Sequence, residues 1–117
     1  MILNVLFALL FAQNIAFAQN IPISVSIWSK YYNQDPFLVM DIISCEGWFA
    51  EIKESKTNDI GPMQINTIHT PQARKMGLNL RVYDDNIHYG IYLMSQEGTD
   101  PWNASKKCWS RHPISGG

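Results

Sequence analysis

The sequence predicts a mainly α-helical single domain. The chain has 117 residues, of which 46% are hydrophobic, and this length supports one modest core. Apolar residues recur at helical spacing in several segments, whereas the strict alternation typical of strands is not seen. The formal net charge is -1, so the chain lacks the excess of Lys and Arg that binding to a phosphate backbone needs. We therefore expect no nucleic-acid partner.

The N-terminal segment, MILNVLFALLFAQNIAFA, contains no charged residue and ends in Ala-Phe-Ala, which fits the pattern before a signal-peptidase site. We expect residues 1–18 to be a cleaved signal peptide and residues 19–117 to form the mature domain. The protein would then be exported to the periplasm, the cell envelope or the extracellular space. An uncleaved membrane anchor is the alternative, although Gln13 and Asn14 interrupt the apolar run short of the roughly 20 residues that a spanning helix needs.

Export changes how the two cysteines, Cys45 and Cys108, are interpreted. An even number of cysteines in a small exported chain favours one disulfide over two buried thiols. Closing a loop of this length would contribute about 4 kcal/mol in the chain-entropy model.

Helix signals follow one another along the rest of the chain. The stretch IPISVSIWSKYYN carries apolar residues at helical spacing, namely Ile23, Ile27 and Tyr31. Thr70 and Pro71 start a short helix that Gly77 stops. After Asp84 and Asp85, a longer helix has one apolar face made of Ile87, Gly90, Ile91 and Met94. Glycine inside this helix predicts close approach by another helix.

The clearest expected helix begins at Pro36, with Asp35 as its N-cap, and runs to about Glu46, where Gly47 ends it. Its inner face would consist of Val39, Ile42, Ile43 and Glu46, so this carboxyl group points toward the core. Residues 50–60 are polar enough for an exposed loop or a short hairpin.

An ionisable carboxyl group at this helix end has a chemical consequence. The helix dipole opposes a negative charge there, and an apolar face with Trp48 nearby desolvates it, so both effects raise the pKa of Glu46. A carboxylic acid that is still protonated near neutral pH can act as a general acid. The alternative is an exposed glutamate that happens to end a helix.

Four segments together resemble the transglycosylase SLT domain, the lysozyme-like catalytic module of soluble lytic transglycosylases. They are YYNQDPFLVMDIISCEG, NDIGPMQIN, KMGLNLRVYDDNIHYGIYLM and PWNASKKCW. The resemblance covers roughly residues 28–109 and is greatest to the small specialised members that accompany secretion systems. It implies a lysozyme-like fold, with a loop or short hairpin after the catalytic helix, and cleavage of peptidoglycan.

The resemblance also assigns residues. The family's catalytic glutamate matches Glu46, and its cleft-lining Gly-Leu-Met-Gln-Ile segment matches residues 61–65, including Met63 and Gln64. Its Asn-Ile-x-x-Gly-x-x-Leu helix begins at Asn86, a structural residue. Its Tyr-Asn-Ala-Gly element falls on Trp102, Asn103, Ala104 and Ser105, where Trp replaces Tyr and Ser replaces Gly.

The family mechanism needs one carboxyl group, whereas ordinary glycoside hydrolysis uses two. Asp59 is the plausible second carboxylate, and a turn-forming role is its alternative. Other cleft candidates are Gln64 as a hydrogen-bonding group, Tyr92, and three tryptophans that could stack on sugar rings, namely Trp48, Trp102 and Trp109. Core packing or loop support is the alternative for each of them.

The expected reaction is cleavage of the β-1,4 bond between N-acetylmuramic acid and N-acetylglucosamine, with a 1,6-anhydro product. We expect no cofactor, since His69, His88 and His112 do not show metal-ligand spacing with the cysteines. The expected partners are peptidoglycan glycan strands and a secretion or envelope complex, and the protein would be a monomer. The alternatives are a hydrolysing lysozyme that uses Asp59 and an inactive glycan-binding module of the same fold.

Overall fold

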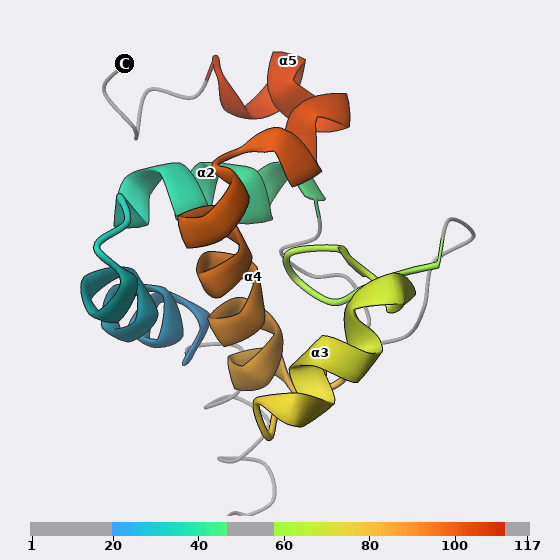
Figure 1. Cartoon of the computed structure of the whole chain (residues 1–117). Coiled ribbons are helices and arrows are strands. Elements are labelled where there is room, and N and C mark those ends of the chain that lie inside the picture. Colours follow the sequence, from blue (N-terminus) through green and yellow to red (C-terminus); the bar gives the residue numbers. More distant parts are fainter. Residues whose placement is uncertain (1–19, 47–57, 112–117) are drawn as a thin grey trace, which may run out of the picture.

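Helix α4 (Tyr83–Glu97) is the central element of the protein. The structure is a computed structural model that describes residues 20–46 and 58–111. In Figure 1, α4 runs through the middle, with the N-terminal helix (residues 20–32) on one side and α3 (Thr70–Lys75) on the other. Within these two described ranges, no helix is long and apolar enough to cross a membrane.

The remaining elements lie around this centre. Helix α2 (Pro36–Glu46) contacts the 3-10 helix η2 (Asp100–Ser105) and α5 (Lys106–Trp109). A second 3-10 helix, η1 (Thr67–His69), leads into α3. The only strands among the described residues are β1 (Asp59–Ile60) and β2 (Ile65–Asn66). The prediction of a mainly helical protein is therefore confirmed.

Helix α2 has the predicted boundaries and the predicted apolar face. The side chain of Asp35 accepts a hydrogen bond from the backbone N–H of Phe37 at 2.9 Å, which caps the helix next to Pro36. Three residues of the expected inner face, Val39, Ile42 and Ile43, are completely buried, and Glu46 is half-buried.

The N-terminal helix forms as predicted, but its apolar stripe faces outward. Ile23, Ile27 and Tyr31 are 56%, 54% and 72% exposed, whereas Ile21 and Val25 are buried. Polar contacts accompany this orientation, because Ser24 Oγ and Trp28 Nε1 both donate to Asp84 Oδ1 of α4, at 2.7 and 3.0 Å. Helical spacing alone identified the helix without identifying its buried side.

The strands form one antiparallel hairpin that pairs Asp59 with Asn66 and Ile60 with Ile65. The hairpin begins at the last two residues of the segment 50–60 that was predicted to be an exposed loop or a short hairpin, and GPMQIN supplies its turn and second strand. Residues 47–57 lie outside the described part of the chain.

Asn86 on α4 connects this hairpin to the core. Its Oδ1 accepts from the N–H of Met63 at 3.1 Å, and its Nδ2 donates to the carbonyls of Ile60 and Leu80 at 2.8 and 2.9 Å. Gly61, at φ 73°, lies so close that a Cβ atom there would be 2.5 Å from Asn86 Nδ2. The predicted structural role of Asn86 is confirmed.

Gly90 permits a close approach, as predicted, but the neighbour is not a helix. A Cβ atom at Gly90 would lie 2.3 Å from Met63 Sδ, so the side chain of the hairpin turn occupies this space. Met63 is completely buried as a result. The hairpin turn therefore packs directly on α4 through Met63 and Asn86.

Replacing Asn86 should destabilise the protein strongly. Asn86→Ala leaves one buried N–H without its acceptor and two carbonyls without their donor, so we expect a loss of about 3 kcal/mol or more in the free energy of unfolding. Denaturant titration measures this loss. The matched control is Asn79→Ala, an exposed asparagine whose side chain accepts one hydrogen bond from Arg81 N. Equal effects of the two substitutions would contradict the central role of Asn86.

Candidate active site

Glu46 ends α2 at the point where three segments meet. The side chain is half-buried, and its Oε1 accepts a hydrogen bond from Ser105 Oγ at 2.5 Å. Ser105 is the last residue of η2, so the two partners are 59 positions apart in the sequence. Asp59 of β1 completes the group, because its charge acts on the Glu46 carboxyl.

The pKa of Glu46 is raised above its ordinary value, mainly because burial disfavours the ionised form. The hydrogen bond from Ser105 lowers the pKa, and the negative charge of Asp59 raises it further. The direction agrees with the sequence prediction. Trp48, which the prediction also invoked, lies outside the described residues.

Asp59, the predicted second carboxylate, lies in a strand and not in a turn. Its Oδ1 accepts a hydrogen bond from Asn66 Nδ2 at 3.1 Å, and the two residues are also partners in the hairpin register. The hairpin thus holds Asp59 in place, and the charge of Asp59 raises the pKa of Glu46.

Ser105 was not predicted as a site residue. In the sequence it stood out only as a departure from the glycine of the Tyr-Asn-Ala-Gly pattern. A hydroxyl at that position would have been the signal, but nothing in the spacing shows that it reaches a residue 59 positions away. Only the packing of η2 on α2 reveals the contact.

The predicted disulfide between Cys45 and Cys108 is present, with Cα atoms 6.0 Å apart. It joins α2 to α5 at the residue directly before Glu46. Ser105 lies three positions before Cys108, so the covalent link restrains both sides of the Glu46 and Ser105 contact.

Two predicted substrate contacts are core residues in this structure. Met63 is completely buried and Trp102 is 2% exposed, with Trp102 Nε1 donating to the carbonyl of Met63 at 2.8 Å. Trp109 is buried as well, and its Nε1 donates to the carbonyl of Trp102 at 3.0 Å. A buried indole presents no ring face to a sugar, so the expected stacking of Trp102 and Trp109 does not fit this arrangement. Both rings are buried in the core and donate hydrogen bonds to backbone carbonyls.

Gln64 uses its amide to support the hairpin turn. At φ 49° it adopts a left-handed conformation that residues other than glycine rarely adopt, and its Nε2 donates to the carbonyl of Gly61 at 2.9 Å. This contact is the loop-supporting alternative considered above. The residue as a whole remains partly exposed.

The two remaining predicted contacts are Asn103 and Tyr92. Asn103 is exposed on η2, next to Trp102. Tyr92 belongs to an aromatic cluster on α4, with ring centroids 5.9 Å from Tyr32 and 5.6 Å from Tyr89. The hydroxyl of Tyr32 is hydrogen-bonded to His88 Nε2 at 2.8 Å, and burial lowers the pKa of His88. The ring of Tyr92 therefore packs within this cluster.

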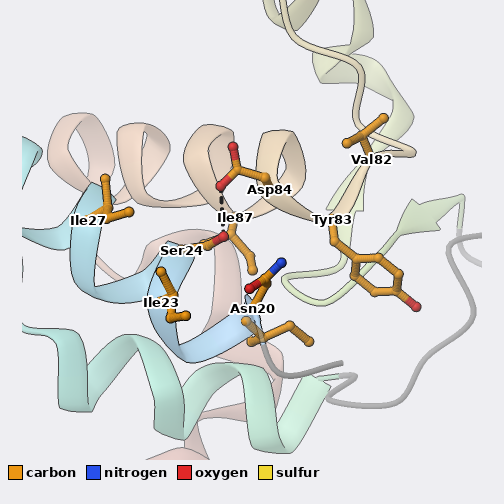
Figure 2. A pocket seen from close by; sticks show the side chains of 9 residues that line it. Asn20, Ile23, Ser24, Ile27, Val82, Tyr83, Asp84 and Ile87 are labelled. Carbon is orange, nitrogen blue, oxygen red and sulfur yellow. Dashed lines mark hydrogen bonds between the residues drawn. The ribbon is translucent and has the colours of Figure 1, made fainter. Parts of the chain in front are cut away.

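A separate pocket lies between the N-terminal helix and the beginning of α4 (Figure 2). Ile23 and Ile27 of the exposed stripe line it together with Val82, Tyr83 and Ile87. The dashed contact in Figure 2, from Ser24 to Asp84, lies on its wall. Its lining includes no member of the Glu46, Ser105 and Asp59 group, so it is a different surface.

The raised pKa of Glu46 predicts a pH-dependent cost in stability. The folded state binds the Glu46 proton more tightly than the unfolded state, so this bound proton stabilises the folded state. Its contribution is fully present below the ordinary pKa of a glutamate and is lost as pH rises through the raised pKa of the folded state. Glu46→Gln removes the ionisation, so the variant should unfold at a higher temperature than the parent at about pH 8, with the difference shrinking toward about pH 4. Glu97→Gln, at an exposed position on α4, is the control. A pH-independent difference would contradict the prediction.

Comparisons with known proteins assign no role to these residues. No family model, no curated protein and no solved structure matches the chain. The candidate site is therefore defined by its own contacts, which are the half-buried carboxyl of Glu46, the hydroxyl of Ser105, the nearby carboxylate of Asp59 and the disulfide beside them.

Proposed function

We propose that this protein is a peptidoglycan lytic transglycosylase with a lysozyme-like fold. The observation that carries the proposal is one carboxyl group, Glu46, which is half-buried at the end of a core helix with a raised pKa. A carboxylic acid that holds its proton near neutral pH is the group that glycosidic bond cleavage requires. The SLT-like segments of the sequence place the family's catalytic glutamate at the same position.

In the proposed reaction, Glu46 gives its proton to the glycosidic oxygen as the bond from that oxygen to C1 of N-acetylmuramic acid breaks. The resulting carboxylate takes the proton from the C6 hydroxyl of the same sugar, and O6 forms a new bond to C1. The product is a 1,6-anhydro sugar, and no water is consumed. An intramolecular nucleophile has a high effective concentration, so a second catalytic carboxylate is not needed. The 2-acetamido group of the substrate can stabilise the oxocarbenium-like transition state.

A hydrolysing lysozyme is the second candidate, and the position of Asp59 favours it. The charge of Asp59 raises the pKa of Glu46, which makes Asp59 the candidate for a second carboxylate that directs a water molecule or stabilises the developing cation. The third candidate is a glycan-binding module that no longer cleaves its ligand. The reaction products and two substitutions, Glu46→Gln and Asp59→Asn, distinguish the three candidate functions.

The proposed setting is the cell envelope. The uncharged segment over residues 1–18 and the disulfide are both compatible with export. The substrate would be the glycan strands of peptidoglycan, and a secretion or envelope complex would place the monomeric protein on the wall. The net charge of -1 provides little electrostatic attraction to an anionic wall, which favours a localising partner.

Product analysis tests the reaction type. Purified protein incubated with peptidoglycan should release saccharides that are lighter by one water than the hydrolysis products, as measured by mass spectrometry. Glu46→Gln should lose activity on the order of a thousandfold while retaining glycan binding. Glu97→Gln serves as the charge-matched control. Products with reducing ends would exclude the transglycosylase, and an unchanged biological effect of Glu46→Gln would favour the binding module.

Asp59→Asn separates the two enzymes. For a transglycosylase we expect a modest change in rate, because Asp59 acts on Glu46 only through its charge. For a hydrolase that uses Asp59 as its second carboxylate, the same substitution should remove about as much activity as Glu46→Gln. Steady-state rates of both variants, measured on the same peptidoglycan, decide between these outcomes.

A further inference from the structure

The hydroxyl of Ser105 has two possible acceptors and one proton. Its Oγ lies 2.5 Å from Glu46 Oε1 and 3.2 Å from the carbonyl oxygen of Trp102. A serine hydroxyl donates one hydrogen bond at a time, so it donates to the carboxyl or to the carbonyl. The nearer acceptor is the carboxyl, and donors to an ionised carboxylate make the stronger hydrogen bonds.

We infer that Ser105 is a positioning residue for Glu46, whose hydroxyl holds Oε1, supports the carboxylate after its proton has left, and leaves Oε2 to exchange the proton with the substrate. The inference rests on the proposed function and deepens it. In the part of the chain that the structure describes, no hydrogen bond reaches Oε2. The two oxygens of Glu46 therefore have different surroundings.

The backbone around Ser105 is held on both sides. Before it, the buried indole of Trp102 is anchored to the carbonyl of Met63, and the carbonyl of Trp102 accepts from Trp109 Nε1. After it, Cys108 is bonded to Cys45, the neighbour of Glu46. Because these contacts restrain the donor and the acceptor together, the hydroxyl can orient the carboxyl without a large entropic cost for each turnover.

The reaction requires Glu46 in both protonation states. Burial favours the acid that protonates the glycosidic oxygen, and the Ser105 hydrogen bond favours the carboxylate that then accepts the C6 proton. The carbonyl of Trp102 gives the hydroxyl a second acceptor while Glu46 is neutral. Ser105 thus offsets part of the effect that desolvation has on the pKa of Glu46.

The other charged groups around Glu46 are the same in the parent and in the Ser105 variants. Asp59 faces it from the hairpin and raises its pKa. On the elements packed against α2, the ionisable side chains are Asp100 of η2 and Lys106 and Lys107 of α5, all exposed, and α2 itself carries Asp41. Substituting Ser105 changes none of these charges, so a shift in the titration of Glu46 reports the lost hydrogen bond.

The experiment titrates Glu46 directly by carboxyl NMR and measures activity in parallel. In Ser105→Ala the titration of Glu46 should move to higher pH, because the charged form has lost a donor. The turnover number should fall on the order of tenfold with little change in KM, and the limb of the pH profile on which Glu46 loses its proton should move in the same direction. Ser105→Thr keeps the hydroxyl and should restore both readouts.

Two further variants complete the test. Ser105→Gly removes the hydroxyl without adding bulk, so it replaces the alanine variant if that one folds poorly. Ser110→Ala changes an exposed serine just after α5 and should behave like the parent. An unshifted Glu46 titration in both the alanine and glycine variants would overturn the role of Ser105, whatever the activity. A shifted titration in a protein that cleaves no glycan would overturn the proposed function and leave the Ser105 contact established.

Discussion

The hydrogen bonds of Asn86 are the interaction on which the rest of the structure depends. This buried amide on α4 binds one N–H and two carbonyls that belong to the hairpin and to the segment before α4. A turn whose first three residues are buried needs such partners, because an unpaired buried backbone group costs about 1–3 kcal/mol. The amide therefore determines where the hairpin can lie.

The candidate site follows from this anchor through a chain of contacts. Asn86 holds Met63, the carbonyl of Met63 accepts from the indole of Trp102, and the next turn of η2 brings Ser105 to Glu46. Each contact joins segments that are distant in the sequence. The tryptophan rings thus contribute to the site by positioning the hydroxyl, and their burial is the reason they can do so.

Glu46 lies between two groups with opposite effects on its proton. Ser105 favours ionisation and Asp59 disfavours it, while burial favours the neutral acid. Ser105 belongs to η2, which is restrained by the nearby disulfide. Asp59 belongs to β1, which is restrained by pairing with β2. In the proposed reaction Glu46 acts first as an acid and then as a base, and these opposed influences favour one protonation state each.

Local spacing and residue chemistry were enough to predict the helices, the cap at Asp35, the disulfide and the acid at the end of α2, Glu46. Tertiary structure decided which side of the N-terminal helix is buried. Ile23, Ile27 and Tyr31 have helical spacing but face solvent, since polar contacts to Asp84 accompany the opposite orientation. It also decided that Ser105 meets Glu46, since a contact across 59 positions is set by packing and leaves no local pattern.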